Sequence, residues 1–115
     1  MDEIENLQAD VLKALAHPRR LRIIHRLADG PAEVGALATE LGMSQPNVSQ
    51  HLAVMRAAGI VEAERIGREV RYRISDPDVV AACATMRRVL ERRIDRLAGL
   101  SEASRTLAPQ LQPTR

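Results

Sequence analysis

The chain has 115 residues, a formal net charge of +2 and a single cysteine, so it forms one domain of modest core without an internal disulfide. Its acidic start lacks a signal-peptide pattern and no apolar run reaches membrane-spanning length, so we expect a cytoplasmic protein without a membrane partner. Tyr72 is the only aromatic residue, which disfavours single-stranded nucleic acid and most RNA, because modules for these ligands stack bases on aromatic rings.

The first third of the chain predicts three helices. Apolar residues recur at helical steps near the N-terminus, at Ile4, Leu7, Val11 and Leu15. His17 precedes Pro18 at the start of the second helix, where we expect it to serve the turn. His25 is expected to pack against the protein, and residues 32–41 are expected to form a short helix closed by Gly42.

The next helix has the features of a DNA recognition helix. Val48, Leu52 and Met55 form an inward apolar stripe, and the polar side chains on the other faces suit contacts with base edges or phosphates. An ordinary surface helix remains the alternative, and His51 could instead brace the turn. The candidate DNA-binding residues here are Ser44, which also suits an N-cap, Gln45, Asn47, Ser49, Gln50 and His51.

After Gly59 the pattern changes to alternation, which predicts a two-stranded hairpin with a basic tip. Val70, Tyr72 and Ile74 alternate with arginines, and the turn is expected at residues 67–69. Guanidinium groups suit phosphate contacts, but interspersed glutamates leave a merely solvated hairpin open. The candidate contacts are Arg65, Arg68 and Arg71, with Arg73 near them.

The last helix is expected to open at Asp76 and Pro77. Its apolar seam is too extended for one small domain to cover, so we expect the first and last helices to build a homodimer. We predict one domain over residues 1–100 and a flexible tail over 101–115. The seam consists of Val79, Cys83, Met86, Leu90, Ile94 and Leu97.

The predicted order of helix, glycine turn, helix and hairpin is a winged helix-turn-helix, a mainly α fold with a small β-hairpin. Four linked blocks resemble the ArsR/SmtB family, and the likeness extends from about Leu7 to Leu97. It implies a homodimeric bacterial repressor that leaves operator DNA when an effector binds. The blocks are residues 15–24 with 34–38, 44–52, 58–61 and 67–72.

The metal-sensing patterns of that family are not intact in this chain. Residues 33–35 lack the Cys-x-Cys pattern, and Asp78 and Arg92 stand where zinc-binding relatives have ligands. We therefore predict no metal site and no cofactor, and the effector stays unknown. Cys83 is the possible sensor, as a thiol or redox switch, although a buried free cysteine more often only packs.

These patterns predict a transcriptional repressor that binds double-stranded DNA at an inverted-repeat operator, without a catalytic site. Two alternatives stay open. A winged-helix protein-interaction module would use Glu62, Glu64 and Glu69 for a protein partner, and a constitutive DNA-binding protein would need no sensor.

Overall fold

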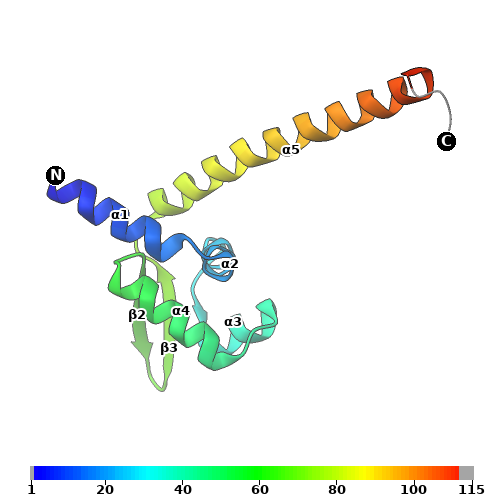
Figure 1. Ribbon diagram of the computed structural model, residues 1–115. Helices are drawn as coiled ribbons and strands as arrows, with labels where there is room; N and C mark the ends of the chain where they lie inside the picture. Colours follow the sequence, from blue (N-terminus) through cyan, green and yellow to red (C-terminus); the bar gives the residue numbers. More distant parts are fainter. Residues whose placement is uncertain (1, 112–115) are drawn as a thin grey trace. The chain divides into compact units, whose positions relative to one another are not determined.

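The computed structural model describes the backbone of residues 2–111 and the side chains of residues 2–103. The chain divides into two units, residues 1–81 and residues 82–115. The first unit contains α1 (Glu3–Leu15), α2 (Pro18–Leu27), β1 (Ala32–Glu33), α3 (Val34–Leu41), α4 (Gln45–Ala57), β2 (Val61–Ile66), β3 (Glu69–Ile74) and the start of α5 (Pro77–Leu111). The second unit is the rest of α5 (Figure 1).

The core of the first unit is formed where α2, α3 and α4 meet the sheet. Its largest side chains are almost completely inaccessible to solvent, and Val11, Leu15 and Tyr72 pack around them. Burial of this apolar surface is the main source of stability for so small a unit. The largest fully buried side chains are Ile23, Ile24, Leu37, Val48, Leu52, Met55, Ile60 and Val61.

The sheet has three strands, one more than the predicted hairpin. Its order is β1-β3-β2, and both pairings are antiparallel. Val61 faces Ile74 and Ile66 faces Glu69, so the predicted hairpin and its turn at Gly67 are confirmed. Ala32, however, pairs with Tyr72. The prediction that residues 32 and 33 begin a helix was wrong, because they pair with backbone groups on the outer edge of β3.

Helix α2 corrects a second expectation. Its buried residues are Ile23, Ile24 and Leu27, whereas His25 is exposed. His25 lies two positions from both Ile23 and Leu27, which places it about 200° round the helix from each. It therefore faces solvent and does not pack.

The predicted apolar stripe of α1 is split between two environments. Val11 and Leu15 contact the core, but Ile4 and Leu7 are 67% and 57% exposed. This helix therefore ends in packed residues and begins with uncovered apolar ones.

Considered alone, the second unit is a helical segment with an uncovered apolar face. Helix α5 continues beyond residue 100 to Leu111, so residues 101–111 have helical backbone, while residues 112–115 lie outside the described residues. The division at residue 100 stays a prediction. No helix in the described part of the chain has both the length and the apolar character needed to cross a membrane. The large exposed apolar residues here are Met86, Val89, Leu90, Ile94, Leu97 and Leu100.

Candidate nucleic-acid interface

Helix α4 is capped at its N-terminus, ends at a glycine turn and packs on the core through one apolar face. The Ser44 hydroxyl accepts a hydrogen bond from the backbone N–H of Asn47 at 3.3 Å, which satisfies a first-turn donor and confirms the predicted N-cap. Gly59 follows the C-cap with a φ of 77°, a left-handed conformation that glycine adopts without strain. Val48, Leu52 and Met55 are fully buried, so the inward stripe is also confirmed.

The opposite face of α4 carries short polar side chains that reach solvent. Asn47, Ser49 and Gln50 are exposed, as are Ser44 and Gln45 at the helix start. Amide and hydroxyl groups on an exposed helix face can bond to base edges without first breaking contacts within the fold. Their role in DNA binding stays a prediction.

Gln45 differs from the others because its amide lies against α3. A Cβ atom added to Gly35 would lie only 2.9 Å from Gln45 Nε2. The added Cβ would meet only the end of the flexible Gln45 side chain, so the contact places the Gln45 amide beside α3. The role of Gln45 in DNA binding stays a prediction.

His51 is tied to the preceding helices. Arg20 Nε donates a hydrogen bond to His51 Nδ1 at 3.1 Å, and the His51 ring centroid lies 4.6 Å from that of His17. His51 is half-buried. Of the two roles expected for His51, this geometry favours bracing, and Arg20 is a partner that sequence spacing did not reveal because 31 positions separate the two residues.

The arginines of the hairpin β2–β3 differ in whether they contact carboxylates or carbonyls of the protein itself. Arg68 is exposed at the turn and has no ion pair within the described part of the chain. Arg65 Nε donates to the Gly67 carbonyl at 3.4 Å, and Arg71 lies 4.0 Å from a Glu69 oxygen. Arg65 and Arg68 therefore keep the most available charge.

Arg73 is paired within the hairpin. Its Nε lies 3.1 Å from Glu62 Oε2 and its Nη1 lies 2.7 Å from Glu64 Oε2. A guanidinium held between two carboxylates has little charge left for an external phosphate. Two of the three glutamates noted in the sequence, Glu62 and Glu64, therefore act on Arg73.

A second acidic contact lies where β1 meets β3. A hydrogen bond with Glu69 raises the pKa of Glu33, and desolvation and the charge of Glu69 add to this effect while Arg71 opposes it. The carboxylates thus compete for the positive charge of Arg71. This neighbourhood makes Arg71 the weakest of the three candidate phosphate contacts.

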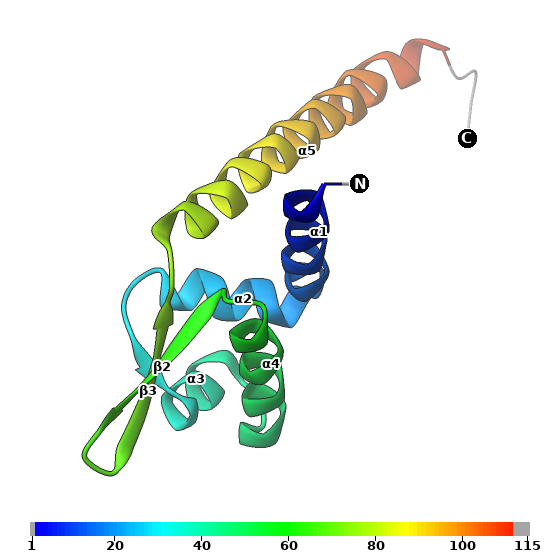
Figure 2. The same cartoon turned by 90° about the vertical axis from the view of Figure 1, so that its left-hand side faces the viewer.

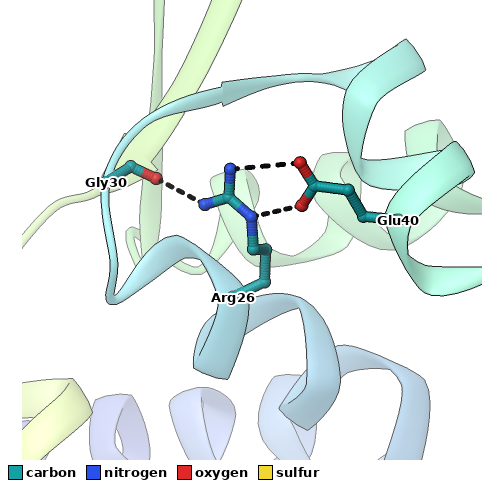
Figure 3. A network of polar contacts seen from close by, with 3 residues as sticks. All are labelled: Arg26, Gly30 and Glu40. Carbon is teal, nitrogen blue, oxygen red and sulfur yellow. Dashed lines mark hydrogen bonds and ion pairs between the residues drawn. The ribbon is translucent and has the colours of Figure 1, made fainter.

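A network of polar contacts joins α2 to α3, the first helix of the helix-turn-helix (Figure 3). Arg26 donates through Nε and Nη2 to the Glu40 carboxylate, and its Nη1 donates to the Gly30 carbonyl at 3.1 Å. A two-pronged guanidinium contact restrains orientation as well as distance. Sequence analysis missed this pair, because 14 positions separate the partners and no helical spacing rule links them.

The N-terminal end of α4 and the turn of the hairpin lie at the same end of the first unit. In both views the N-terminal end of α4 and the turn between β2 and β3 point the same way (Figures 1 and 2). The unit therefore offers a helix face for a groove together with cations for an adjacent backbone.

The possible sensor residue Cys83 lies on α5 and is half-buried. Burial raises the pKa of its thiol, which favours the neutral and less nucleophilic form. Its sensor role stays a prediction. Among the described residues, no three histidine, cysteine or acidic side chains gather as a metal ion would require.

In a comparison with protein families, residues 17–63 match the family described as "Bacterial regulatory protein, arsR family". The HTH-type transcriptional regulator Rv0081 of Mycobacterium tuberculosis (strain ATCC 25618 / H37Rv) is 39% identical over 103 residues, which cover 88% of this chain and 90% of that protein. The biofilm growth-associated repressor of Xylella fastidiosa (strain 9a5c) is 40% identical over 76 residues, which cover 66% and 67% of the two chains.

Solved structures show the same likeness. The crystal structure of Rv0081 from M. tuberculosis has a TM-score of 0.74 and 38% identity, covering 84% of this chain and 99% of that one. The solution structure of the homodimeric winged helix-turn-helix DNA-binding domain of Mb0332 from Mycobacterium bovis has a TM-score of 0.71 and 39% identity. It covers 76% of this chain and 82% of that one.

Proposed function

The chain belongs to the arsR family of bacterial regulatory proteins, and we propose that it acts as a homodimeric repressor that binds an inverted-repeat operator in duplex DNA. The observation that carries this proposal is the construction of α4. Its apolar stripe is fully buried, so the polar face with Asn47 and Gln50 is held rigidly toward solvent. A helix whose backbone is already fixed loses little backbone freedom when it enters a groove.

We assign the base-reading role to Gln50 and Asn47, with Ser49 beside them. Each amide side chain can bond adenine bidentately in the major groove. Ser44 sets the start of the helix as its N-cap and can add a backbone contact, and Gln45 in the first turn of α4 is a further candidate for a DNA contact. Arg65 and Arg68 are assigned to phosphate, and Arg71 is a weaker contact because carboxylates compete for it.

The homodimer is proposed from the uncovered apolar side chains of α1 and α5. Ile4 is 67% exposed, and the apolar residues of α5 from Met86 to Leu100 are 45–67% exposed. Such a contiguous apolar stripe on a helix usually marks an interface. The homodimeric domain of Mb0332, which shares the fold, supports pairing with a second copy, and two-fold symmetry would set half-sites about one helical turn apart.

Release of the operator by an effector or a redox signal belongs to the same proposal, with Cys83 as the candidate sensor and with constitutive binding as the alternative. We assign the chain no catalytic role, since its family consists of regulators. Because its target would be chromosomal DNA, we place its action in the cytoplasm.

The acidic side chains of the hairpin favour one other function. Glu62 and Glu64 hold Arg73, and Glu69 lies 4.0 Å from Arg71, so carboxylates offset part of the positive charge of the hairpin. A winged-helix module that binds a protein would tolerate this loss of positive charge better than a DNA-binding hairpin. Salt dependence separates the two functions, because only phosphate contacts release condensed counterions.

The test is fluorescence-anisotropy binding of the reduced, metal-free protein to duplex DNA from upstream of its own coding region. A scrambled duplex of equal length serves as the control, and both are measured across a salt series. We expect selective binding with a steep decrease of affinity as salt rises. Equal and weak binding to both duplexes would contradict the proposal and favour the protein-interaction module.

A further inference from the structure

Two histidines and an arginine form a cluster behind the recognition helix α4. His17 is the N-cap of α2, and its Nδ1 accepts a hydrogen bond from the backbone N–H of Arg19 at 3.1 Å. His51, on the flank of α4, accepts a hydrogen bond through Nδ1 from Arg20 Nε at 3.1 Å. The two rings are in contact, with centroids 4.6 Å apart. We call His17, Arg20 and His51 the imidazole cluster.

The cluster links three helices. Arg20 also donates through Nη1 to the carbonyl of Ala14 in the last turn of α1, at 3.2 Å. A single guanidinium therefore joins α1, its own helix α2 and the recognition helix α4. Because His51 is one position from Gln50, a change in this bond would act next to the exposed polar residues of α4.

Both hydrogen bonds require uncharged imidazoles. A guanidinium and a backbone N–H are always donors, so each Nδ1 must be an acceptor without a proton. A neutral ring meets this need when its proton is on Nε2. A protonated ring has N–H groups on both nitrogens, so it faces another donor and loses the bond.

The surroundings add electrostatic opposition to protonation. Desolvation lowers the pKa of His51, and His17, Arg20 and Arg19 lower it further. Within the described part of the chain neither ring is bonded to a carboxylate that would favour its cationic form. On the three helices joined here, the charged groups that act on His51 are thus the two arginines of α2 and the other imidazole.

We propose that the imidazole cluster is a proton-sensitive positioning device for the recognition helix, so that sequence-selective DNA binding weakens as the solution becomes mildly acidic. The inference rests on the proposed function and adds a regulation to it. The direction follows from linkage. An arrangement that accepts only neutral rings is favoured over the disrupted one above about pH 6.5, which is the ordinary pKa of a histidine side chain. It is lost as the pH falls below that value, because the disrupted arrangement binds the additional protons.

The size of the effect follows from the same linkage. Between pH 7.5 and pH 5.5, protonation of one ring favours the disrupted arrangement by up to about ten-fold. That factor is the upper limit of the loss in operator affinity per protomer, because the loss reaches it only when the disrupted arrangement dominates. In a dimer the factors of the two clusters multiply, so the upper limit becomes about one hundred-fold.

The test measures anisotropy binding of the full chain to operator and scrambled duplexes at pH 7.5 and pH 5.5 and constant ionic strength. The readout is the ratio of operator affinities at the two pH values within each protein. In the double variant H17N/H51N, each Asn oxygen can take the place of Nδ1 as acceptor and does not titrate, and Asn is also a favourable N-cap. We expect a ratio clearly above one, and at most about one hundred, for the wild type and a ratio close to one for the double variant.

The matched control is His25→Asn, which removes the remaining histidine, an exposed residue of α2 outside the cluster. It should keep the wild-type ratio. A ratio near one for the wild type, or one lost through His25→Asn, would overturn the inference while selective binding at pH 7.5 still upheld the proposed function. Absence of selective binding at pH 7.5 would overturn both.

An NMR titration of the wild-type rings keeps the test independent of how the variants fold. At pH 7.5, His17 and His51 should both show the form protonated only on Nε2, and His51 should titrate below about pH 6.5. A proton on His51 Nδ1 at pH 7.5 would contradict the inference.

Discussion

Arg68→Ala offers the sharpest prediction for the hairpin, because Arg73 on the same hairpin provides a control of equal charge. Arg68 is exposed at the turn without an ion pair in the described part of the chain, whereas Arg73 contacts two carboxylate oxygens at 3.1 and 2.7 Å. Removing either arginine lowers the net charge by one per protomer. A difference between the two variants therefore reports a local phosphate contact and not the overall charge.

The magnitude follows from counterion release. Each phosphate neutralised on duplex DNA contributes about 0.9 to the slope of log affinity against log salt. A homodimer presents two copies of Arg68, so Arg68→Ala should reduce the slope by about 1.8. Operator and scrambled DNA should weaken similarly, because a phosphate contact has no sequence information.

The assay is anisotropy binding over a salt series from low to physiological ionic strength, with wild type, Arg68→Ala and Arg73→Ala compared on both duplexes. We expect Arg73→Ala to change the slope by less than half as much as Arg68→Ala. Equal slope changes for the two variants would refute the reasoning, since they would show that the ion pairs of Arg73 leave its charge available or that Arg68 touches no phosphate.

Three further predictions concern α4 and α5. Gln50→Ala should reduce discrimination between operator and scrambled DNA, at a cost of about 1–3 kcal/mol per base contact; unchanged discrimination in anisotropy competition would show that the helix reads DNA through another face. Leu52→Ala should lower the free energy of unfolding by about 2–5 kcal/mol, because Leu52 is fully buried. Chemical denaturation measures this loss against that of the exposed Ser49→Ala, and comparable losses would contradict the burial of Leu52. Cys83→Ser should still bind operator DNA and remain dimeric in light scattering; loss of the dimer would make Cys83 a packing residue.

Local patterns predicted the recognition helix because its determinants lie close together in the sequence. The N-cap at Ser44 and the stripe of Val48, Leu52 and Met55 depend on helical geometry alone, and the structure confirms both. The hairpin was predictable for the same reason, since alternation and a glycine turn are also local signals.

The features that sequence analysis missed depend on residues far apart in the chain. Strand β1 exists because Ala32 meets Tyr72. Bracing was one of the two roles expected for His51, but its partner Arg20 was missed because 31 positions separate the two residues. No periodicity encodes such pairs. His25 was misplaced because the buried face of α2 is set by contacts with the rest of the core, which a single helix pattern does not fix.

Selection of bound duplexes from a random-sequence pool tests the central proposal most directly, because it requires no knowledge of the operator. For the wild-type protein, we expect enrichment of an inverted repeat whose half-sites lie about one helical turn apart, or a small multiple of it. Gln50→Ala in the same experiment should weaken the enriched motif. A pool that stays random, or a motif without two-fold symmetry, would contradict a homodimeric repressor that reads DNA through α4.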